Sequence, residues 1–315
     1  MIRLGALGDL VLCFQAFHEI RVAFPSARIA LLTMPAFAAF ARSMPWFDEV
    51  LTDSRATLSR LREWVSLARQ VYAFRPQRVF DLQGKFRQSL LFGLMGGWMG
   101  CGPQWSGAAR FCSHPRPWPP KPGTHFCDFL SAQLRAAEVP AAGGADLSWL
   151  DAPMDCFQAL LPQRPFALLI PGCSVGREFK RWPPKRYAAL ANRLLAKGIE
   201  SIAVGTAAEA ESIAELCRNA PHVCDFSGRT SLHQLAALAR RSVCVVGNNT
   251  GPTHLAAAVG APTLMLMSEK CTPLWSAPRG PLAKVLQGYP LASLTEDEVW
   301  RSLGDFESGR IAWRK

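Results

Sequence analysis

The second half of the chain alternates short apolar runs with stretches whose apolar residues recur at helical spacing. The apolar runs lie at residues 166–171, 199–205, 242–246 and 262–267, each of a length typical of a buried strand. The stretches between them, at 183–197, 207–218 and 231–240, have the pattern of amphipathic helices. This alternation predicts an α/β fold in which helices cover both faces of a parallel sheet.

Two local signals support particular helices in this half. The helix after residue 183 begins at a proline, which suits a first helical turn, and ends at Gly198. Its apolar stripe consists of Tyr187, Leu190, Ala191, Leu194 and Leu195. The pair Thr295 and Glu298 forms a capping box that predicts a last helix through Leu303.

The first half shows the same alternation less clearly. Residues 1–4, 28–33 and 78–82 predict short strands, and residues 58–68 predict a helix with Leu58, Leu61, Val65, Leu67 and Ala68 on its apolar side. A single helix is predicted from Asp9 to Phe24, stopped by Pro25. Its inward residues are Leu10, Phe14, Phe17 and Val22.

A weakly patterned stretch at residues 136–164, rich in Ala, Gly and Pro, separates the two series. It predicts a linker between two α/β domains at residues 1–150 and 151–315, a division that fits the length of the chain. Ligands of open parallel sheets bind beyond the carboxyl ends of the strands. With two such domains, the expected site is a cleft between them.

Composition narrows the class of protein. The 35 Lys and Arg exceed the 24 Asp and Glu, giving a net charge of +11 that is spread over both halves without a basic block. This charge favours a solubilising surface over a nucleic-acid face, and it also suits an anionic membrane surface or a phosphorylated acceptor. Ten cysteines without a Cys-x-x-Cys pair or a signal peptide predict reduced thiols in the cytoplasm. The most apolar stretch, at 90–102, is too short and too Gly-rich to span a bilayer, so any membrane contact is expected to be peripheral.

The most informative segment is Val246–Leu255, where an apolar strand ends in small and polar residues that open an Ala-rich helix at 255–259. Such a junction directs backbone N–H groups and the positive end of a helix dipole toward one point, which is a typical phosphate site. Thr250 and His254 add side-chain donors. The alternative is that Asn and Thr only cap the helix.

Two further loops have candidate chemistry. Gly5 and Gly8 precede a predicted helix at whose start Asp9 lies, so Asp9 is either a general base or a helix cap. The dinucleotide fingerprint G-x-G-x-x-G is absent there. Beyond the strand at 166–171, Lys180 and Arg181 precede the proline that opens the next helix. Lys180 is suited to neutralise a diphosphate, and the alternative is an exposed basic pair. Ser231 is predicted to be an ordinary cap.

In their order and spacing these motifs resemble the heptosyltransferase family, glycosyltransferase family 9, nearly from end to end. The matching segments are Arg3–Asp9, Asp81–Gly84, Pro171–Trp182, Gly228–Leu232 and Gly247–Ala257. The resemblance implies a GT-B fold, two Rossmann-like domains facing across a cleft. In that fold residues 1–150 bind the acceptor and residues 151–315 bind the nucleotide-sugar. The implied reaction is inverting transfer of a heptose from ADP-heptose to the inner core of lipopolysaccharide or a similar glycolipid or glycan acceptor.

The resemblance also implies residue roles. Asp9 matches the family's proposed base, Lys180 its diphosphate-binding lysine, and Ser174, Thr250, Gly251 and His254 its donor-pocket positions. Gly172 and Asn249 complete the expected donor set, and Gly5 and Gly8 the expected cleft loop. The chain departs from the family pattern in a shorter first strand and in Asn249, where the family often has Asp. Residues 90–124 match the family loosely.

Neither a cofactor nor a metal is expected, because the nucleotide-sugar is a substrate and no Asp-x-Asp pair is present to hold Mg²⁺. The six histidines show no metal-ligand spacing. Two alternatives remain open at this stage. One is another nucleotide-sugar enzyme, either a transferase of a different sugar or an epimerase. The other is a non-catalytic protein that binds a nucleotide or a polyanion, although nucleic acid is not the expected partner.

Overall fold

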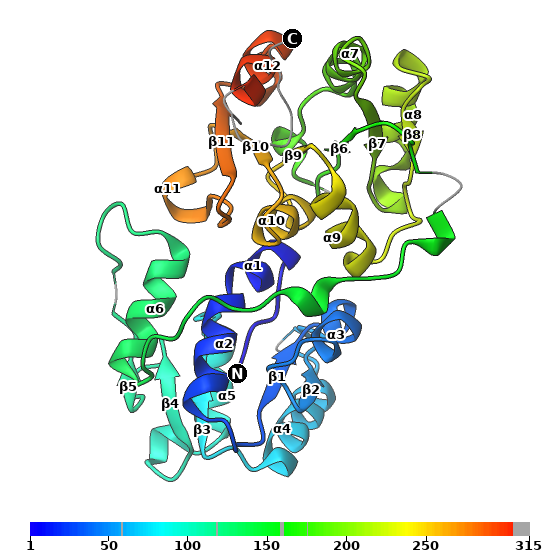
Figure 1. The fold of residues 1–315 in the computed structure, drawn as a ribbon. Helices are drawn as coiled ribbons and strands as arrows, with labels where there is room; N and C mark the ends of the chain where they lie inside the picture. The colour runs from blue at the N-terminus through cyan, green and yellow to red at the C-terminus, as the bar shows by residue number, and fades with distance from the viewer. Residues whose placement is uncertain (58, 118, 158–160, 175, 305–315) are drawn as a thin grey trace. The chain divides into compact units, whose positions relative to one another are not determined.

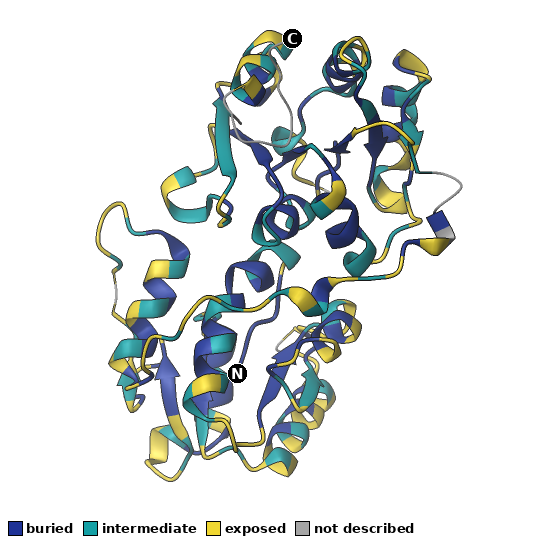
Figure 2. Ribbon diagram, in the orientation of Figure 1, coloured by how far each residue is buried: buried dark blue, intermediate teal, exposed yellow. Residues whose placement is uncertain are grey.

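The structure, a computed structural model, describes residues 1–57, 59–117, 119–157, 161–174 and 176–304. The chain divides into two compact units, Met1–Trp149 and Leu150–Lys315, here called unit 1 and unit 2 (Figure 1). Each unit contains parallel strands with helices between them, which confirms the predicted α/β class. The central strands of each unit are buried, as the dark blue of Figure 2 shows.

Unit 2 is built around a six-stranded parallel sheet in the order β11-β10-β9-β6-β7-β8. Its strands are β6 (Phe166–Ile170), β7 (Glu200–Ala203), β8 (Cys224–Asp225), β9 (Cys244–Asn248), β10 (Thr263–Ser268) and β11 (Ala283–Gly288). Its helices are α7 (Pro184–Leu195), α8 (Ala210–Asn219), α9 (Leu232–Arg241), α10 (Gly251–Ala258), α11 (Pro273–Ser276) and α12 (Glu296–Gly304), with short 3₁₀ turns η3 (Asp155–Phe157), η4 (Glu178–Lys180), η5 (Ala207–Glu209) and η6 (Leu291–Ser293). The first and fourth strands of the unit, β6 and β9, are neighbours at the centre, where the direction of winding reverses.

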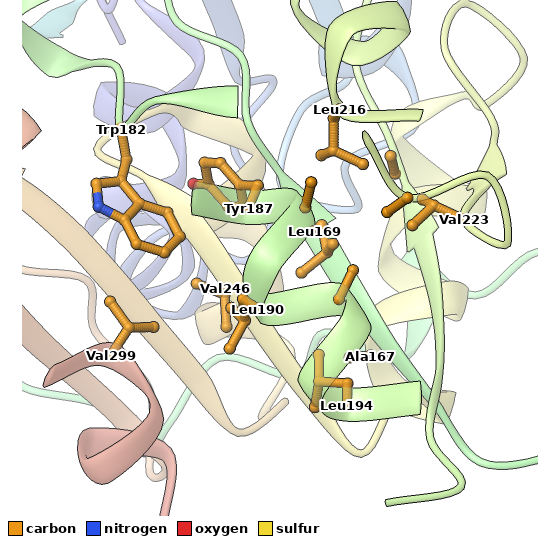
Figure 3. Packing of buried hydrophobic residues seen from close by; sticks show 14 of the residues in the cluster. Ala167, Leu169, Trp182, Tyr187, Leu190, Leu194, Leu216, Val223, Val246 and Val299 are labelled. Atoms are coloured by element: carbon orange, nitrogen blue, oxygen red, sulfur yellow. The ribbon is translucent and has the colours of Figure 1, made fainter. Parts of the chain in front are cut away.

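The core of unit 2 packs α7 against one face of this sheet (Figure 3). The apolar stripe predicted for the helix is buried at Tyr187, Leu190, Ala191 and Leu194, whereas Leu195 is half-buried. Trp182, fully buried, meets the Tyr187 ring edge-on at 4.8 Å between centroids and donates from Nε1 to the Leu294 carbonyl at 2.8 Å. Aromatic rings bury large apolar areas, so this pair anchors the segment that precedes α7.

The predicted helix caps of unit 2 are confirmed. Ser231 Oγ accepts from the Gln234 N–H at 3.2 Å, and Thr295 exchanges hydrogen bonds with Glu298 at the start of α12.

Unit 1 contains two small parallel sheets, β1-β2 and β3-β4-β5. Its strands are β1 (Ala30–Thr33), β2 (Glu49–Thr52), β3 (Arg78–Phe80), β4 (Gln104–Gly107) and β5 (His114–Pro115). Its helices are α1 (Leu7–Leu12), α2 (Phe14–Ala23), α3 (Pro35–Arg42), α4 (Leu61–Phe74), α5 (Phe86–Leu94) and α6 (Phe126–Ala136), with a 3₁₀ turn η1 (Gly97–Met99), and η2 (Ser148–Leu150) lies at the boundary of the units.

The predicted first strand at residues 1–4 is reduced to a bridge at Ile2, which pairs with Leu32 of β1 and with Asp81 after β3. The Ile2 N–H donates to the Phe80 carbonyl at 2.9 Å, and the Arg3 N–H to the Leu32 carbonyl at 3.0 Å. Residues 1–3 therefore link the two small sheets. With this segment counted first, unit 1 follows the same spatial order as unit 2, in which the first and fourth segments are central.

Three predictions for unit 1 helices were wrong in detail. The helix expected at Asp9–Phe24 starts at Leu7 and is interrupted at Cys13, which separates α1 from α2. Val22, expected inside, is 50% exposed. In α4 the buried side is formed by Trp64, Leu67 and Val71, while the expected Leu61 and Val65 are exposed and Leu58 lies outside the described residues. The helix is rotated from the prediction because the ring of Trp64 buries more area than the aliphatic side chains of Leu61 or Val65 would.

Unit 1 has a cavity of about 610 Å³ under the amino ends of its strands, lined in part by Met1, Phe24, Ala30, Val79 and Trp105. The Met1 α-amine donates to the Ala30 carbonyl at 2.7 Å, and burial lowers the pKa of this amine to about 5. Since ligands of such sheets bind at the carboxyl ends of the strands, this cavity is separate from the candidate site.

Candidate functional site

In unit 1 the loops Gly5–Asp9 and Asp81–Gly84 follow the two central segments, at their carboxyl ends. They are joined directly, because the Leu4 N–H donates to Gln83 Oε1 at 3.0 Å and Arg3 Nη1 donates to the Leu82 carbonyl at 2.6 Å. Two motifs 79 residues apart therefore form one polar surface at the point where the strand order reverses.

Asp9 occupies the first turn of α1, and its side chain is 45% exposed. Oδ2 accepts from the Ala6 N–H at 3.1 Å and lies 2.9 Å from Arg3 Nη2. Asp9 thus makes a cap contact through Oδ2, while Oδ1 has no hydrogen bond to any described residue. The carboxylate is held in place on one side and open on the other.

Arg3, which holds Asp9, is a buried guanidinium, and it also lies over the Phe126 ring at 4.8 Å. Gly5 has φ +127°, and a Cβ there would lie 2.4 Å from the Phe37 ring, so this loop requires glycine. Gly8 lies within α1 and is half-buried.

Asp81 is the buried counterpart of Asp9, with 1% of its surface exposed. Its Oδ1 accepts from the Gln83 and Gly84 N–H groups at 3.0 and 2.9 Å, and its carbonyl accepts from Arg116 Nη2 at 2.6 Å. Burial raises the pKa of the Asp81 carboxyl, against the opposing effect of these N–H groups and of Arg116. Arg116 was not identified from the sequence, since its contact with Asp81 joins residues 35 positions apart.

In unit 2 the loops after β6 and β9 are fixed to each other by Asn248, which is fully buried. Asn248 Nδ2 donates to the carbonyls of Pro171 and Gly172 at 2.8 and 3.1 Å. Its Oδ1 accepts from the Trp182 N–H at 3.1 Å and from Tyr187 Oη at 3.0 Å. Sequence reasoning selected its neighbour Asn249 and missed this residue, whose partners lie 61 to 77 positions away.

The helix after β9 begins at Gly251, four residues earlier than predicted, because Gly and Pro are accepted in a first turn. Thr250 is at the N-cap but makes no side-chain cap bond, and its Oγ1 lies 3.4 Å from the Asn248 carbonyl. The Gly251 and Thr253 N–H groups donate to no acceptor in the described part of the chain. The start of α10 therefore presents free N–H donors of the kind that bind anions.

Asn249 and His254, both predicted donor-site residues, are buried, with 7% and 5% exposure. The Asn249 N–H pairs with the Leu266 carbonyl at 3.0 Å, which extends the contact of β9 with β10. Asn249 and His254 thus flank the start of α10 but have little surface open to solvent.

Lys180 ends η4 and is half-buried. Its ammonium makes no ion pair or hydrogen bond with the residues that the structure describes. Trp182, two residues after Lys180, anchors this segment, because its N–H donates to Asn248 Oδ1. Ser174 is exposed, and its carbonyl accepts from the Arg177 N–H at 3.1 Å. Lys180 therefore keeps its charge available for a ligand, on a segment tied to the loop after β9.

Glu209 is a further residue that sequence reasoning missed. A Cβ on Gly172 would lie 2.5 Å from the Glu209 carboxyl carbon, so glycine is needed there to admit this carboxylate. Glu209 Oε2 accepts from Thr206 Oγ1 at 2.7 Å. It adds an acidic group beside the loop after β6.

Within the described residues there is no group of three or more His, Cys, Asp or Glu side chains placed to share a metal ion. None of the helices described is both long and apolar enough to cross a bilayer.

Residues 64–286, more than half of the chain, match the family model for glycosyltransferase family 9 (heptosyltransferase). The lipooligosaccharide heptosyltransferase 2 of Haemophilus influenzae is 31% identical over 158 residues, which are 48% of this chain and 43% of that relative. The chain thus spans less than half the length of this curated relative.

Solved structures extend the similarity to the whole fold. The E. coli ADP-heptose lipopolysaccharide heptosyltransferase II superposes with a TM-score of 0.75 at 20% identity and covers 96% of both chains. The E. coli heptosyltransferase WaaC, solved with ADP, gives 0.75 at 18% identity over 96% of this chain and 98% of that one. These similarities confirm the expected GT-B type of α/β fold, and together with the sequence match they show that the chain belongs to glycosyltransferase family 9, the heptosyltransferase family.

Proposed function

We propose that this chain is an inverting glycosyltransferase that transfers a heptose from ADP-heptose to a lipopolysaccharide core or a similar glycolipid or glycan. Family membership supports sugar transfer, and the names of the similar proteins support the heptose and the lipopolysaccharide acceptor. In this proposal unit 1 binds the acceptor and unit 2 binds the nucleotide-sugar.

The observation that carries the proposal is the start of α10 together with Lys180. Free N–H groups and a lysine without an ion-pair partner among the described side chains suit a diphosphate. When the sugar leaves, negative charge develops on that diphosphate, and donors already in place stabilise it. We therefore assign the leaving-group contacts to Lys180, Thr250 and Gly251, with Ser174 and Gly172 lining the loop after β6.

Asp9 is the proposed general base. The acceptor hydroxyl oxygen forms the new bond to the anomeric carbon while the bond from that carbon to the diphosphate oxygen breaks. The hydroxyl proton passes to Oδ1 of Asp9, since Oδ2 is already bound by Arg3 and Ala6. The proposed mechanism needs no metal ion, because Lys180 supplies the positive charge at the leaving group.

Glu209 has a proposed role at the nucleotide. In sheets with this strand order, an acidic residue near the second strand commonly accepts from the ribose hydroxyls. Glu209 follows β7, the second strand of unit 2, and lies against Gly172. We assign it to the ribose of the donor.

The test combines transfer and binding. The purified chain is expected to form ADP and a heptosylated product from ADP-heptose and a heptose-deficient lipopolysaccharide, with equal rates in EDTA. Product formation without an acceptor would instead indicate an epimerase, and transfer from another nucleotide-sugar a different transferase. Salt-sensitive RNA binding without ADP binding would indicate a non-catalytic polyanion-binding protein.

Binding measurements isolate the diphosphate contact. Lys180→Ala is expected to raise the Kd for ADP about tenfold, the effect of one charge-assisted hydrogen bond, and to leave the Kd for adenosine nearly unchanged. Lys185→Ala, an exposed lysine in the first turn of α7, is the matched control and is expected to bind both ligands normally. An equal loss for ADP and adenosine would contradict the diphosphate contact.

A further inference from the structure

Positive charge is concentrated in one part of unit 1. Residues 54–127 contain 11 Lys and Arg but only two acidic residues, Glu63 and Asp81, whereas the rest of residues 1–157 contains five Lys and Arg and ten Asp and Glu. Asp81 is buried, and the Glu63 carboxylate is bound by Ser54 and Arg60. Charge that looks evenly spread between the two halves of the sequence is therefore strongly localised within the first half.

The same part of unit 1 exposes most of the large apolar side chains that the described surface presents. They come from α4, from α5 and from η1 just after it, and they are Leu61 (72% exposed), Val65, Tyr72, Phe86, Leu94, Trp98 and Met99 (78% exposed). We call this set the α4–α5 apolar face. Scattered apolar residues are normal on a surface, but a contiguous group marks an interaction site.

Contacts between these elements show that the face is contiguous. Tyr72 Oη donates to the Leu94 carbonyl at 2.7 Å, which joins the ends of α4 and α5. The Trp98 ring lies against Gly93 of α5, where an added Cβ would be 2.6 Å from the ring. Leu61, Val65 and Tyr72 are spaced by four and seven residues and so share one side of α4.

Exposed basic side chains lie on the same two helices as this face or next to them. Arg62 and Arg69 lie on α4, Arg75 follows it and Lys85 precedes α5, and all four are exposed (the exposed positions along α4 are yellow in Figure 2). None of the four has an ion-pair partner among the described residues. Their positive charge is therefore free to meet an external anion.

We propose that the α4–α5 apolar face docks unit 1 on the surface of an anionic phospholipid bilayer. Trp98 and Tyr72 are the residue types that settle at the boundary between headgroups and acyl chains, and Leu61, Leu94 and Met99 supply apolar area to insert. Arg62 and Arg69 then contact the phosphates. A nucleic acid would satisfy the arginines but leave the aliphatic side chains in water, so the lipid surface fits better. This inference concerns a surface of unit 1, whereas the proposed donor contacts belong to unit 2, and it goes beyond the proposed reaction.

The test is co-sedimentation of the full chain with vesicles of phosphatidylcholine alone or mixed with phosphatidylglycerol. The wild-type protein is expected to bind the mixed vesicles and to be released by salt, because screening weakens the arginine contacts. Arg62→Gln with Arg69→Gln is expected to lower the partition coefficient about fivefold for each charge. Trp98→Ser with Met99→Ser is expected to lower it about tenfold or more, from the loss of inserted apolar area.

Matched controls come from unit 2, where Leu274→Ser removes an apolar side chain of similar exposure and Arg218→Gln removes an exposed arginine. Both controls are expected to bind vesicles like the wild type, and circular dichroism establishes that every variant is folded. Failure of the folded wild-type protein to bind mixed vesicles would overturn the proposal. So would equal loss in the controls, or self-association in the absence of lipid that the Trp98 and Met99 substitutions abolish. Heptosyl transfer to a lipid-free acceptor is measured separately, so the result does not depend on the proposed reaction.

Discussion

Units 1 and 2 have the same strand order, but they differ in the residues that lie where this order reverses, between the first and fourth segments. In unit 1 this point is charged, with Arg3, Asp9, Asp81 and Arg116 joined through the two loops. In unit 2 its interior is neutral, with Asn248 bound to Tyr187 and to the backbone of three residues, and the charge of Lys180 lies further out.

One topology can therefore serve two chemical tasks. The proposed general base, Asp9, needs a fixed orientation, which the buried Arg3 provides. The proposed diphosphate site needs donors already in place, which the free N–H groups at the start of α10 and the Lys180 ammonium provide. Substitutions in the two units separate these requirements.

Asp9→Asn is expected to reduce the proposed transfer about 10³-fold, because the amide retains the contact with Ala6 but cannot take a proton. The Kd for ADP is expected to stay unchanged, since the donor contacts are assigned to unit 2. Steady-state kinetics and calorimetry measure the two quantities.

Asp48→Asn is the matched control for Asp9. Asp48 is also in unit 1, is 49% exposed, and is bound by an arginine, Arg21, and by a backbone N–H, that of Ile29. It lies at the amino ends of the strands and is expected to have normal turnover. A similar loss in both variants, or turnover near normal in Asp9→Asn, would remove Asp9 from the role of base.

Asn248→Ala is expected to lower the free energy of unfolding by about 2–4 kcal/mol, because it leaves the Trp182 N–H and the Pro171 carbonyl unpaired in the interior. Asn249→Ala is expected to cost clearly less, since only the backbone of Asn249 has a described hydrogen bond. Urea denaturation without ligand gives both values. Equal losses at the two positions would mean that the Asn248 contacts do not hold the junction together.

Asp81→Asn is expected to have the smallest effect, and the size of that effect depends on pH. Burial raises the pKa of Asp81 above its ordinary value of 3.8, so the folded protein keeps this proton to a higher pH than the unfolded chain does. As the pH rises above 3.8, ionising the buried carboxyl therefore costs the wild type stability that the amide variant keeps. At neutral pH the variant is expected to be more stable than the wild type, and the two proteins converge in acid.

Asp48→Asn supplies the opposite sign in the same experiment. The Ile29 N–H and Arg21 lower the pKa of Asp48, so this carboxylate stabilises the folded protein at neutral pH, and that contribution is lost as the pH falls through its lowered pKa. Thermal unfolding across the acidic range compares the two variants. Parallel curves for both would contradict the assigned effect of burial at Asp81.

The sequence predicted unit 2 better than unit 1 because the strands of unit 2 are continuous apolar runs buried on both faces. β6, β9 and β10 lie within one or two residues of their predicted limits. Strands β2 and β4 of unit 1 are four residues long, and β2 is only half-buried, so neither has a distinctive pattern. The first segment pairs only at Ile2, which periodicity alone does not show.

The candidate site was predictable where the sequence carries a local signal and not where contacts are long-range. Gly5, Asp9, Thr250 and Gly251 stand in loops whose composition marks them. Asn248 and Arg116 act on residues far along the chain, and no local pattern indicates such contacts. The burial of Asn249 and His254 depends on packing, which the sequence alone does not show, and their contact with the donor stays a prediction.

The central place of residues 1–3 in unit 1 bears on the order in which that unit folds. These residues are synthesised before Leu82, yet Arg3 binds Leu82, 79 positions later. Closing so long a loop is slow compared with forming the helices between, so residues 1–3 are among the last of unit 1 to be fixed. The loop that carries Asp9 acquires its geometry at the same late step. A partly synthesised unit 1 therefore has most of its helices before it has its proposed base in place.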